Sequence, residues 1–166
     1  RHSGDVTPIA EFNMWSDPQA ARAVMRSPIG KILVPLDVSN EPGLTFDDVD
    51  RLSGLIPSTP VGEFVIDLLQ FAVRANRQFL PREEVPIPAA AVLAIAAHAT
   101  KFATETVVLD VETTGELTSG MTIVDRRPFG SRQTNAEVVT QFDVPAVIDY
   151  FCRGVRRIAV SSEGRA

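Results

Sequence analysis

Helical and strand-like hydrophobic patterns alternate along the first half of the chain, and this alternation limits the folds open to it. A helical pattern over residues 17–27 precedes an apolar run over residues 31–38, which has the length of a buried strand. In the second half, strand-like runs follow one another at residues 106–112, 121–125 and 136–142. Alternating strands and helices favour parallel pairing, whereas consecutive strands favour antiparallel pairing. The pattern therefore predicts an α/β fold with a mixed sheet.

Local signals mark where the predicted helices begin. Asp17 followed by Pro18 supplies a side-chain cap and a proline at the first helical position. Thr45 and Asp48 have the spacing of a capping box, with aspartate in place of glutamate. Pro60 opens a longer helix, whose apolar stripe at helical spacing contains Phe64, Val65, Leu68, Leu69, Ala72 and Ala75. The remaining expected helices cover residues 89–99 and 145–158.

Prolines and glycines mark the predicted loops and turns. Residues 80–88 contain three prolines and three charged side chains, so this segment is predicted to be a loop. Residues 113–116 and 128–131 separate strand-like runs and have the composition of hairpin turns. Pro35 lacks an amide hydrogen, so the strand over residues 31–38 is expected at a sheet edge or to end there.

Length and charge restrict the class of protein. With 166 residues, 45% of them hydrophobic, the chain is long enough for a single domain over residues 1–166 with its own core. The formal net charge is −5, and the basic residues are scattered apart from the pairs at 126–127 and 156–157. No basic stripe is available to follow a phosphate backbone, so nucleic acid is not an expected partner.

The most apolar run and the cysteine content indicate the compartment. Residues 87–99 are interrupted by Pro88, end in a stretch that contains His98, and are shorter than the roughly 20 residues that a bilayer span requires. We therefore expect no membrane partner. Cys152 is the only cysteine, which excludes an internal disulfide. The first residues are polar and lack the apolar core of a signal peptide, so a reducing cytoplasm is the expected location.

Several motifs resemble the nucleoside hydrolase family, whose members cleave the N-glycosidic bond of ribonucleosides. Residues 5–13 (DVTPIAEFN) and 17–21 (DPQAA) are similar to the family's Ala-Glu-Phe-Asn segment and the helix that follows it. Residues 36–39 (LDVS) and 110–125 resemble a family strand end and a family hairpin, and Asn135 matches an asparagine at the next strand. The matches occur in family order over about residues 4–160. The resemblance implies the C-terminal portion of a Rossmann-like fold, with a mixed, mainly parallel sheet and a β-hairpin.

The resemblance also implies which side chains contact the substrate, a nucleoside or its ribose. The family's glutamate and asparagine that bind ribose hydroxyls match Glu11 and Asn13. On a strand, residues two apart point to the same face, and the end of a strand borders the crevice where α/β sheets bind ligands. A further family asparagine matches Asp5, which accepts hydrogen bonds but does not donate them. Without the family, Glu11 and Asn13 would be ordinary polar residues at a strand end.

Other polar or aromatic residues have simpler interpretations. Asp17 is a helix cap, and Glu112 and Asp125 are hydrogen-bonding residues of the hairpin rather than catalysts. His98, Cys152 and Trp15 are interpreted as packing residues, although Trp15 follows Asn13 closely enough to line a pocket wall.

Residues that the family's chemistry requires are missing from these 166 residues. The family holds Ca²⁺ with an Asp-x-Asp-x-x-x-Asp-Asp cluster, whereas Asp47, Asp48 and Asp50 are interpreted as the solvated first turn of a helix. Ile87 and Pro88 occupy the positions of the family's catalytic histidine and calcium-binding aspartate. Neither can supply a proton or a carboxylate. We therefore expect no catalytic residue, no bound metal, and an inactive chain if it acts alone.

Three hypotheses follow. The chain is a truncated or decayed portion of a ribonucleoside hydrolase that serves purine or pyrimidine salvage, a non-catalytic nucleoside- or ribose-binding or subunit-interaction remnant, or a fold that binds no ligand. Family members commonly form dimers or tetramers, which makes a homo-oligomer one expectation. Without the family's first half, an uncovered parallel sheet edge is also expected to promote association. The preferred nucleobase does not follow from the sequence.

Overall fold

The computed structural model describes residues 4–79, 83–127 and 133–161. Its helices and strands in chain order are α1 (Phe12–Ser16), α2 (Pro18–Arg26), β1 (Ile32–Leu33), α3 (Leu36–Ser39), β2 (Gly43–Leu44), α4 (Phe46–Ser53), α5 (Pro60–Phe79), β3 (Val85–Pro86), α6 (Pro88–Ala96), β4 (Phe102–Val107), β5 (Leu109–Val111), β6 (Thr122–Val124), β7 (Ala136–Phe142) and α7 (Val144–Ser161).

Contacts between residues group the chain into two compact units. Unit 1 comprises Arg1–Val38 and Phe102–Phe142, and unit 2 comprises Ser39–Lys101 and Asp143–Ala166. Each unit therefore combines two segments that are distant in the sequence. The single domain expected from chain length stays a prediction.

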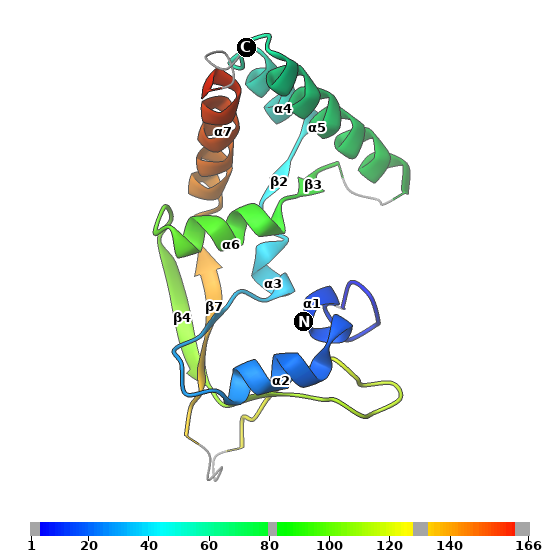
Figure 1. Cartoon of the computed structure of the whole chain (residues 1–166), viewed down its shortest axis with the longest axis vertical. Coiled ribbons are helices and arrows are strands. Elements are labelled where there is room, and N and C mark those ends of the chain that lie inside the picture. Colours follow the sequence, from blue (N-terminus) through cyan, green and yellow to red (C-terminus); the bar gives the residue numbers. More distant parts are fainter. Residues whose placement is uncertain (1–3, 80–82, 128–132, 162–166) are drawn as a thin grey trace. The chain divides into compact units, whose positions relative to one another are not determined.

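The main sheet of unit 1 has the strand order β1-β7-β4. The long strands β4 and β7 run antiparallel from the pair Phe102 and Phe142 to the pair Val107 and Ala136 (Figure 1). β1 is parallel to β7 on its other side. The observed sheet confirms the predicted α/β fold with mixed strand directions, and β7 coincides with the predicted strand over residues 136–142.

The strand predicted over residues 31–38 is much shorter than expected. Only Ile32 and Leu33 pair with β7, and residues 36–39 form the short helix α3 instead. Pro35 has no amide hydrogen to donate to a neighbouring strand, which limits the strand's extension. The edge position predicted from Pro35 is confirmed, since β1 lies at one edge of the sheet. Association through this edge stays a prediction.

Unit 1 also contains a hairpin and helix α2. β5 and β6 pair antiparallel, and the predicted turn at residues 113–116 lies in their connection. The predicted turn at residues 128–131 falls outside the described residues. Helix α2 contacts β5. One buried core cluster of this unit contains Met25, Val107, Leu109, Val111 and Ala136, with Met14, Ala21, Leu33, Val124 and Val138 packed against it.

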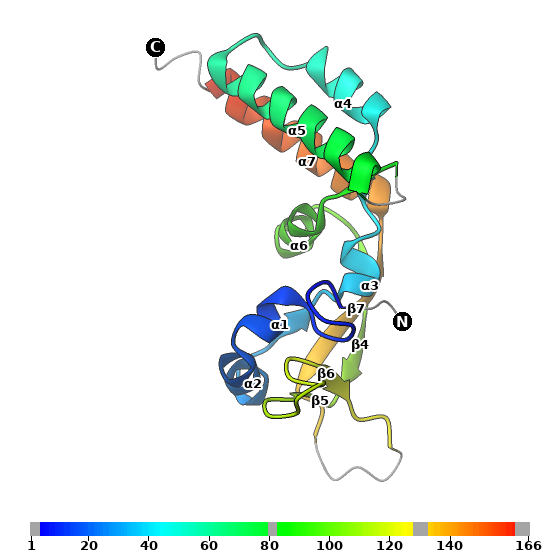
Figure 2. The same ribbon diagram turned by 90° about the vertical axis from the view of Figure 1, so that its right-hand side faces the viewer.

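Unit 2 is mainly helical. Helix α4 begins with the predicted capping box, in which the Asp48 amide donates to Thr45 Oγ1 at 3.2 Å and the Thr45 amide donates to Asp48 Oδ2 at 3.0 Å. Helices α5 and α7 lie alongside each other (Figure 2), and α7 also contacts α6. Within the predicted loop at residues 80–88, Val85 and Pro86 form β3, which pairs with β2. One core cluster of this unit contains the buried residues Leu44, Val49 and Val73, with Phe46, Leu69, Val85, Ile87, Ile148 and Phe151 packed against it.

The apolar stripe predicted on α5 is only partly buried. Leu69 packs against the core of unit 2, and Val73, which is not part of the predicted stripe, is buried. In contrast, Phe64 and Leu68 are 66% and 52% exposed, and so is Phe71 at 66%. Helical spacing predicted an apolar side of the helix, but the buried side is rotated away from these three residues.

Candidate functional site

The segment that carries Glu11 and Asn13 begins a helix rather than ending a strand. Glu11 is the N-cap of α1, and its Oε2 accepts hydrogen bonds from the amides of Asn13 at 2.8 Å and Met14 at 3.2 Å. The predicted strand at this position is therefore wrong. A strand requires a neighbour to pair its backbone groups, and none of the described strands pairs with residues 5–10. A carboxylate cap instead satisfies the first amides of a helix locally.

The side chains of Glu11 and Asn13 contact each other. Asn13 Nδ2 donates to Glu11 Oε1 at 2.7 Å, and Asn13 is exposed to solvent. An ionised carboxylate offers about four acceptor positions, of which the structure shows three in use. The pair can thus accept a further hydroxyl hydrogen at Glu11 and both donate and accept at Asn13.

Asp5 lies in a compact loop before this segment. The Gly4 amide donates to Pro8 O at 3.1 Å, and the Ala10 amide donates to Thr7 Oγ1 at 3.0 Å. A Cβ at Gly4 would collide with backbone atoms of Ala10, which explains a glycine there. Asp5 is exposed, and among the described residues it makes no hydrogen bond to Glu11 or Asn13. The structure therefore joins two of the three predicted substrate residues.

Two arginines of α2 form ion pairs with the hairpin strand β5. Arg22 Nε donates to Asp110 Oδ1 at 3.0 Å, and Arg26 donates from Nη2 to Asp110 Oδ2 at 2.8 Å. Partial burial acts to raise the pKa of Asp110, but the hydrogen bonds from Arg26 and Arg22 outweigh it and hold the pKa well below its ordinary value. This cluster was not predicted from the sequence. Its signal was a lone aspartate within an apolar strand together with two arginines four residues apart on one helix.

Asn135 connects three segments of unit 1. Its Nδ2 donates to Leu109 O at 2.8 Å and to Met25 O at 2.9 Å, and its Oδ1 accepts from the Leu109 amide at 2.7 Å. The side chain thus forms hydrogen bonds with a backbone amide and a backbone carbonyl of β5, as a neighbouring strand would, and also with a backbone carbonyl near the end of α2. These bonds indicate a structural role for the matched family asparagine.

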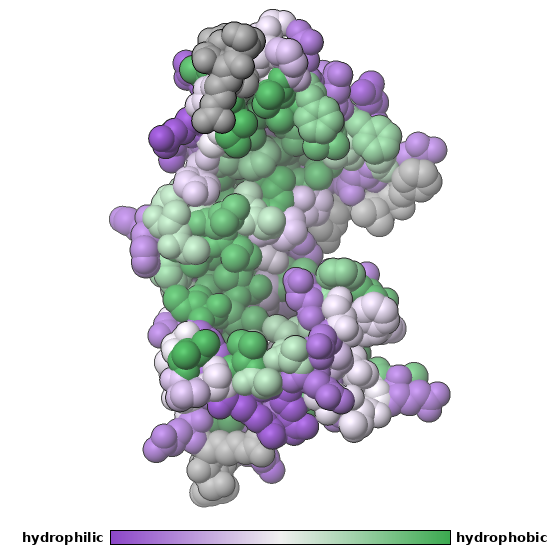
Figure 3. Space-filling model, viewed as in Figure 1, coloured by the Kyte–Doolittle hydropathy of each residue, from purple (hydrophilic) through white to green (hydrophobic). Residues whose placement is uncertain are grey.

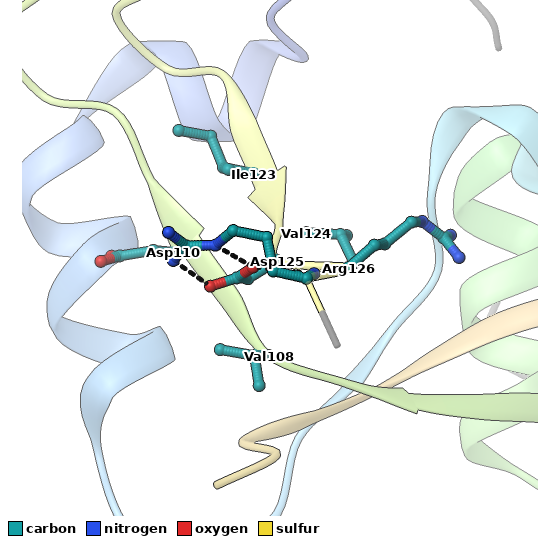
Figure 4. A pocket seen from close by; sticks show the side chains of 7 residues that line it. Val108, Asp110, Ile123, Val124, Asp125 and Arg126 are labelled. Carbon is teal, nitrogen blue, oxygen red and sulfur yellow. Dashed lines mark hydrogen bonds and ion pairs between the residues drawn. The ribbon is translucent and has the colours of Figure 1, made fainter. Parts of the chain in front are cut away.

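A hollow of about 700 Å³ beside the hairpin has four charged residues in its lining, but their side chains do not converge on one point (Figure 4). Arg127 donates to Asp125 at 2.8 and 2.6 Å, so both charges are engaged. Asp110 and Arg126 point to opposite sides of the hollow in Figure 4. A binding site usually brings several polar groups to one point, so this hollow carries no assignment. Glu11 and Asn13 are not among its lining residues, which are Val108, Asp110, Ile123, Val124, Asp125, Arg126 and Arg127.

The described residues do not fit the calcium ion that the family implies. Among them, no group of three or more His, Cys, Asp or Glu side chains is placed to hold a metal. Asp48 accepts hydrogen bonds from Thr45 and Arg51, and Asp47 belongs to the first turn of α4. Calcium requires six to eight oxygen ligands.

Ile87 and Pro88, which the resemblance aligns with the family's histidine and aspartate, have structural roles here. Ile87 packs against the core of unit 2 and precedes α6, and Pro88 is the first residue of that helix. Neither side chain offers a proton or an oxygen ligand. A proline is favourable at a helix start, because the missing amide hydrogen would have no partner in the helix.

Comparison with known proteins identifies the family. Residues 1–149 match the family described as inosine-uridine preferring nucleoside hydrolase. The chain belongs to this nucleoside hydrolase family. It is 30% identical over 155 residues to a pyrimidine-specific ribonucleoside hydrolase RihA of Shewanella woodyi, covering 92% of this chain and 48% of that protein. A RihA from Shewanella sp. strain MR-4 is 33% identical over 149 residues, covering 88% and 46%.

Solved nucleoside hydrolases have the same fold. A purine-preferring ribonucleoside hydrolase from Gardnerella vaginalis aligns with a TM-score of 0.76 and 25% identity over 95% of this chain and 49% of that one. A plant nucleoside hydrolase, 18% identical, aligns with a TM-score of 0.74 over 93% of this chain and 50% of that one, which supports the fold alone. This nucleoside hydrolase chain spans about half the length of the curated relatives that it matches. None of its described helices has the length and apolarity to cross a membrane.

Proposed function

We propose that this nucleoside hydrolase chain contributes a wall that binds the ribose of a nucleoside, and that Glu11 and Asn13 make the contacts. The observation that carries the proposal is the hydrogen bond of 2.7 Å between these two side chains at the surface, within the family's motif. Asp5 is a weaker candidate for the same site. Because the chain belongs to this family, we propose hydrolysis of the N-glycosidic bond as the reaction of intact proteins with this fold.

The chemistry of a sugar diol suits this pair. A ribose hydroxyl donates its hydrogen to the Glu11 carboxylate, while its oxygen accepts from an Asn13 amide hydrogen. Hydrogen bonds to a charged group contribute more than neutral ones, so Glu11 is expected to account for most of the affinity. Asn13 adds selectivity for a hydroxyl group, since its amide can donate a hydrogen bond to the hydroxyl oxygen and accept one from the hydroxyl hydrogen.

We further propose that the chain does not cleave nucleosides by itself. In the family, calcium activates the attacking water and binds the ribose, and a histidine protonates the leaving base. Ile87 and Pro88 replace the matching side chains, and the described residues do not fit the metal. Because Cys152 has no cysteine partner, a reducing cytoplasm is the proposed compartment.

Ligand-observed NMR is expected to show contact between the wild-type chain and ribose, uridine or inosine. Saturation transfer should be strongest at the ribose protons and weaker at the base. Glu11→Gln should weaken binding by about tenfold, which is the effect of one charged hydrogen bond. Asn13→Ala should weaken it by about threefold to tenfold.

Asp17→Asn is the matched control for this experiment. It also removes one negative charge at a nearby helix start, where Asp17 accepts from the Ala20 amide at 2.9 Å, and asparagine caps a helix equally well. Its affinity should equal that of the wild type. Absence of saturation transfer in the wild type, or equal losses in Asp17→Asn and Glu11→Gln, contradicts the ribose-binding proposal.

A subunit-interaction role is the second candidate, and the exposed face of α5 favours it. Phe64, Leu68 and Phe71 lie on one side of this helix and are all more than half exposed. Figure 3 shows apolar surface over the part of the molecule that contains α5. Large apolar residues gathered on one helix face often mark an interaction surface. We propose a second copy of the chain as the partner.

Sedimentation velocity over a range of concentrations is expected to show self-association that depends on this face. Phe64→Ser and Leu68→Ser should each weaken the association by about tenfold or more, because each removes the burial of a large apolar side chain. Leu117→Ser is the control, since Leu117 is an exposed apolar residue of the other unit. A monomer at all concentrations, or equal effects of all three substitutions, rules out this role for α5.

A further inference from the structure

Gly120 occupies a conformation and a position that other residues would not tolerate. It lies at the end of the hairpin connection and has a φ of +83°, in the left-handed region that favours glycine. Its amide donates to Glu112 O at 2.8 Å, and the Glu112 amide donates to Met121 O at 3.0 Å. These two hydrogen bonds close the connection between β5 and β6.

The backbone of Gly120 lies directly against the segment that carries Glu11 and Asn13. A Cβ added to Gly120 would lie 2.8 Å from Trp15 Cα, 3.0 Å from Trp15 N and 3.2 Å from Ala10 Cβ. Ala10 is fully buried and precedes Glu11, while the Trp15 amide donates to Glu11 O at 2.9 Å. Gly120 therefore touches both ends of the turn that presents the two side chains.

The hairpin connection is held firmly enough to serve as a support. Glu112 accepts hydrogen bonds from the amides of Thr113 at 2.9 Å, Thr114 at 2.9 Å and Gly115 at 3.3 Å. These hydrogen bonds from Thr114, Thr113 and Gly115 hold the pKa of Glu112 below its ordinary value, so the carboxylate is charged at neutral pH. The strand before it ends in the buried Val111, which belongs to the core of unit 1.

We propose that Gly120 is a positioning residue, and that the connection over residues 112–121 is the surface against which the first turn of α1 is seated. Only a residue without a side chain allows this close approach of the two backbones. The contact sets where Glu11 and Asn13 lie and keeps their hydrogen bond formed. The link to ribose binding rests on the proposed function, whereas the link to the geometry of α1 does not.

Amide exchange and fluorescence of the intact chain test this inference. Gly120→Ala should accelerate the exchange of the Asn13, Met14 and Trp15 amides by about tenfold, because the added Cβ displaces the turn. Exchange in β4 and β7 should stay unchanged. Trp15 is the only tryptophan, so its emission maximum should shift with the same substitution. Gly30→Ala is the matched control, since a Cβ at Gly30 meets no atom within 4 Å.

Glu112→Ala provides a second variant if Gly120→Ala does not fold. It removes the acceptor for three amides of the connection and should also accelerate exchange at Asn13 and Met14, while β4 and β7 keep their protection. Unchanged exchange and emission in the variant that folds, or acceleration spread equally over β4 and β7, overturns the positioning role.

Ribose titration of the same variants separates the two proposals. If the wild type binds ribose, Gly120→Ala should weaken binding, and Gly30→Ala should not. If the wild type does not bind ribose, the proposed function fails. The exchange and emission results still decide whether Gly120 positions the turn.

Discussion

The 166-residue chain is expected to release no free base from inosine or uridine, with or without added Ca²⁺. Cleavage of the glycosidic bond needs an activated water on one side of the sugar and a proton donor for the leaving base on the other. Ile87 is part of the apolar packing of unit 2 and cannot donate a proton. Asp48 is engaged by Thr45 and Arg51, and Asp110 by two arginines of α2. Neither is available as a calcium ligand without breaking these interactions.

Restoring the two family residues should not rescue the chain alone. Ile87→His with Pro88→Asp supplies an acid and one carboxylate but leaves water activation without its metal cage. Co-expression with the N-terminal half of an intact relative is expected to raise turnover of this double variant and to leave the unmodified chain inactive. Chromatography of released base and calorimetric titration of Ca²⁺ measure both outcomes, with an intact RihA as the positive control. Metal-dependent release by the unmodified chain would show that other residues replace the family's acid and calcium site.

Asn135→Asp is expected to lower the free energy of unfolding of unit 1 by about 3 kcal/mol, because it removes two donated hydrogen bonds and places a charge against carbonyl oxygens. The wild-type side chain donates to Leu109 O and Met25 O, and a carboxylate can donate to neither. The facing carbonyl oxygens should raise the pKa of the introduced carboxyl in the folded state. Its cost is then fully present above that raised pKa and diminishes as the pH falls through it, because the protonated form can donate one hydrogen bond.

Chemical denaturation followed by Trp15 fluorescence measures this effect in unit 1. Gln133→Glu is the matched control, since it makes the same change from amide to acid at an exposed position two residues away. It should change the free energy of unfolding by less than about 0.5 kcal/mol. A loss below about 1 kcal/mol in Asn135→Asp would mean that the three hydrogen bonds of Asn135 are replaced by water at little cost.

The family and most helix boundaries could be predicted from sequence because their signals are local. Asp17 caps α2 and Thr45 caps α4 through hydrogen bonds to amides three residues ahead, which any chain with these residues can form. The antiparallel pair of β5 and β6 was predictable for a similar reason, since a short connection brings the strands together. The motif with Glu11 and Asn13 identified the candidate site by resemblance, although not its local structure.

The candidate site's geometry and its supports depend on residues far apart in the sequence. Asn135 binds the carbonyl of Met25, which is 110 positions away, and Arg22 binds Asp110 across 88 positions. Gly120 lies close to Trp15, and the residues next to either one in the sequence do not predict this contact. Side-chain spacing carries no information about such pairs.

Strand and burial predictions differed from the structure for the same physical reason. Helices satisfy their backbone groups internally, so caps and spacing in the sequence are enough to place α2, α4 and α5. A strand forms only where another strand pairs with it. The strand predicted over residues 31–38 is therefore limited to Ile32–Leu33, and Glu11 begins a helix instead of ending a strand. The exposure of Phe64 and Leu68 likewise depends on which side of α5 meets α7 and the rest of unit 2. Interactions between residues a few positions apart can be predicted from the sequence. Strand pairing and side-chain burial depend on distant segments that folding brings together.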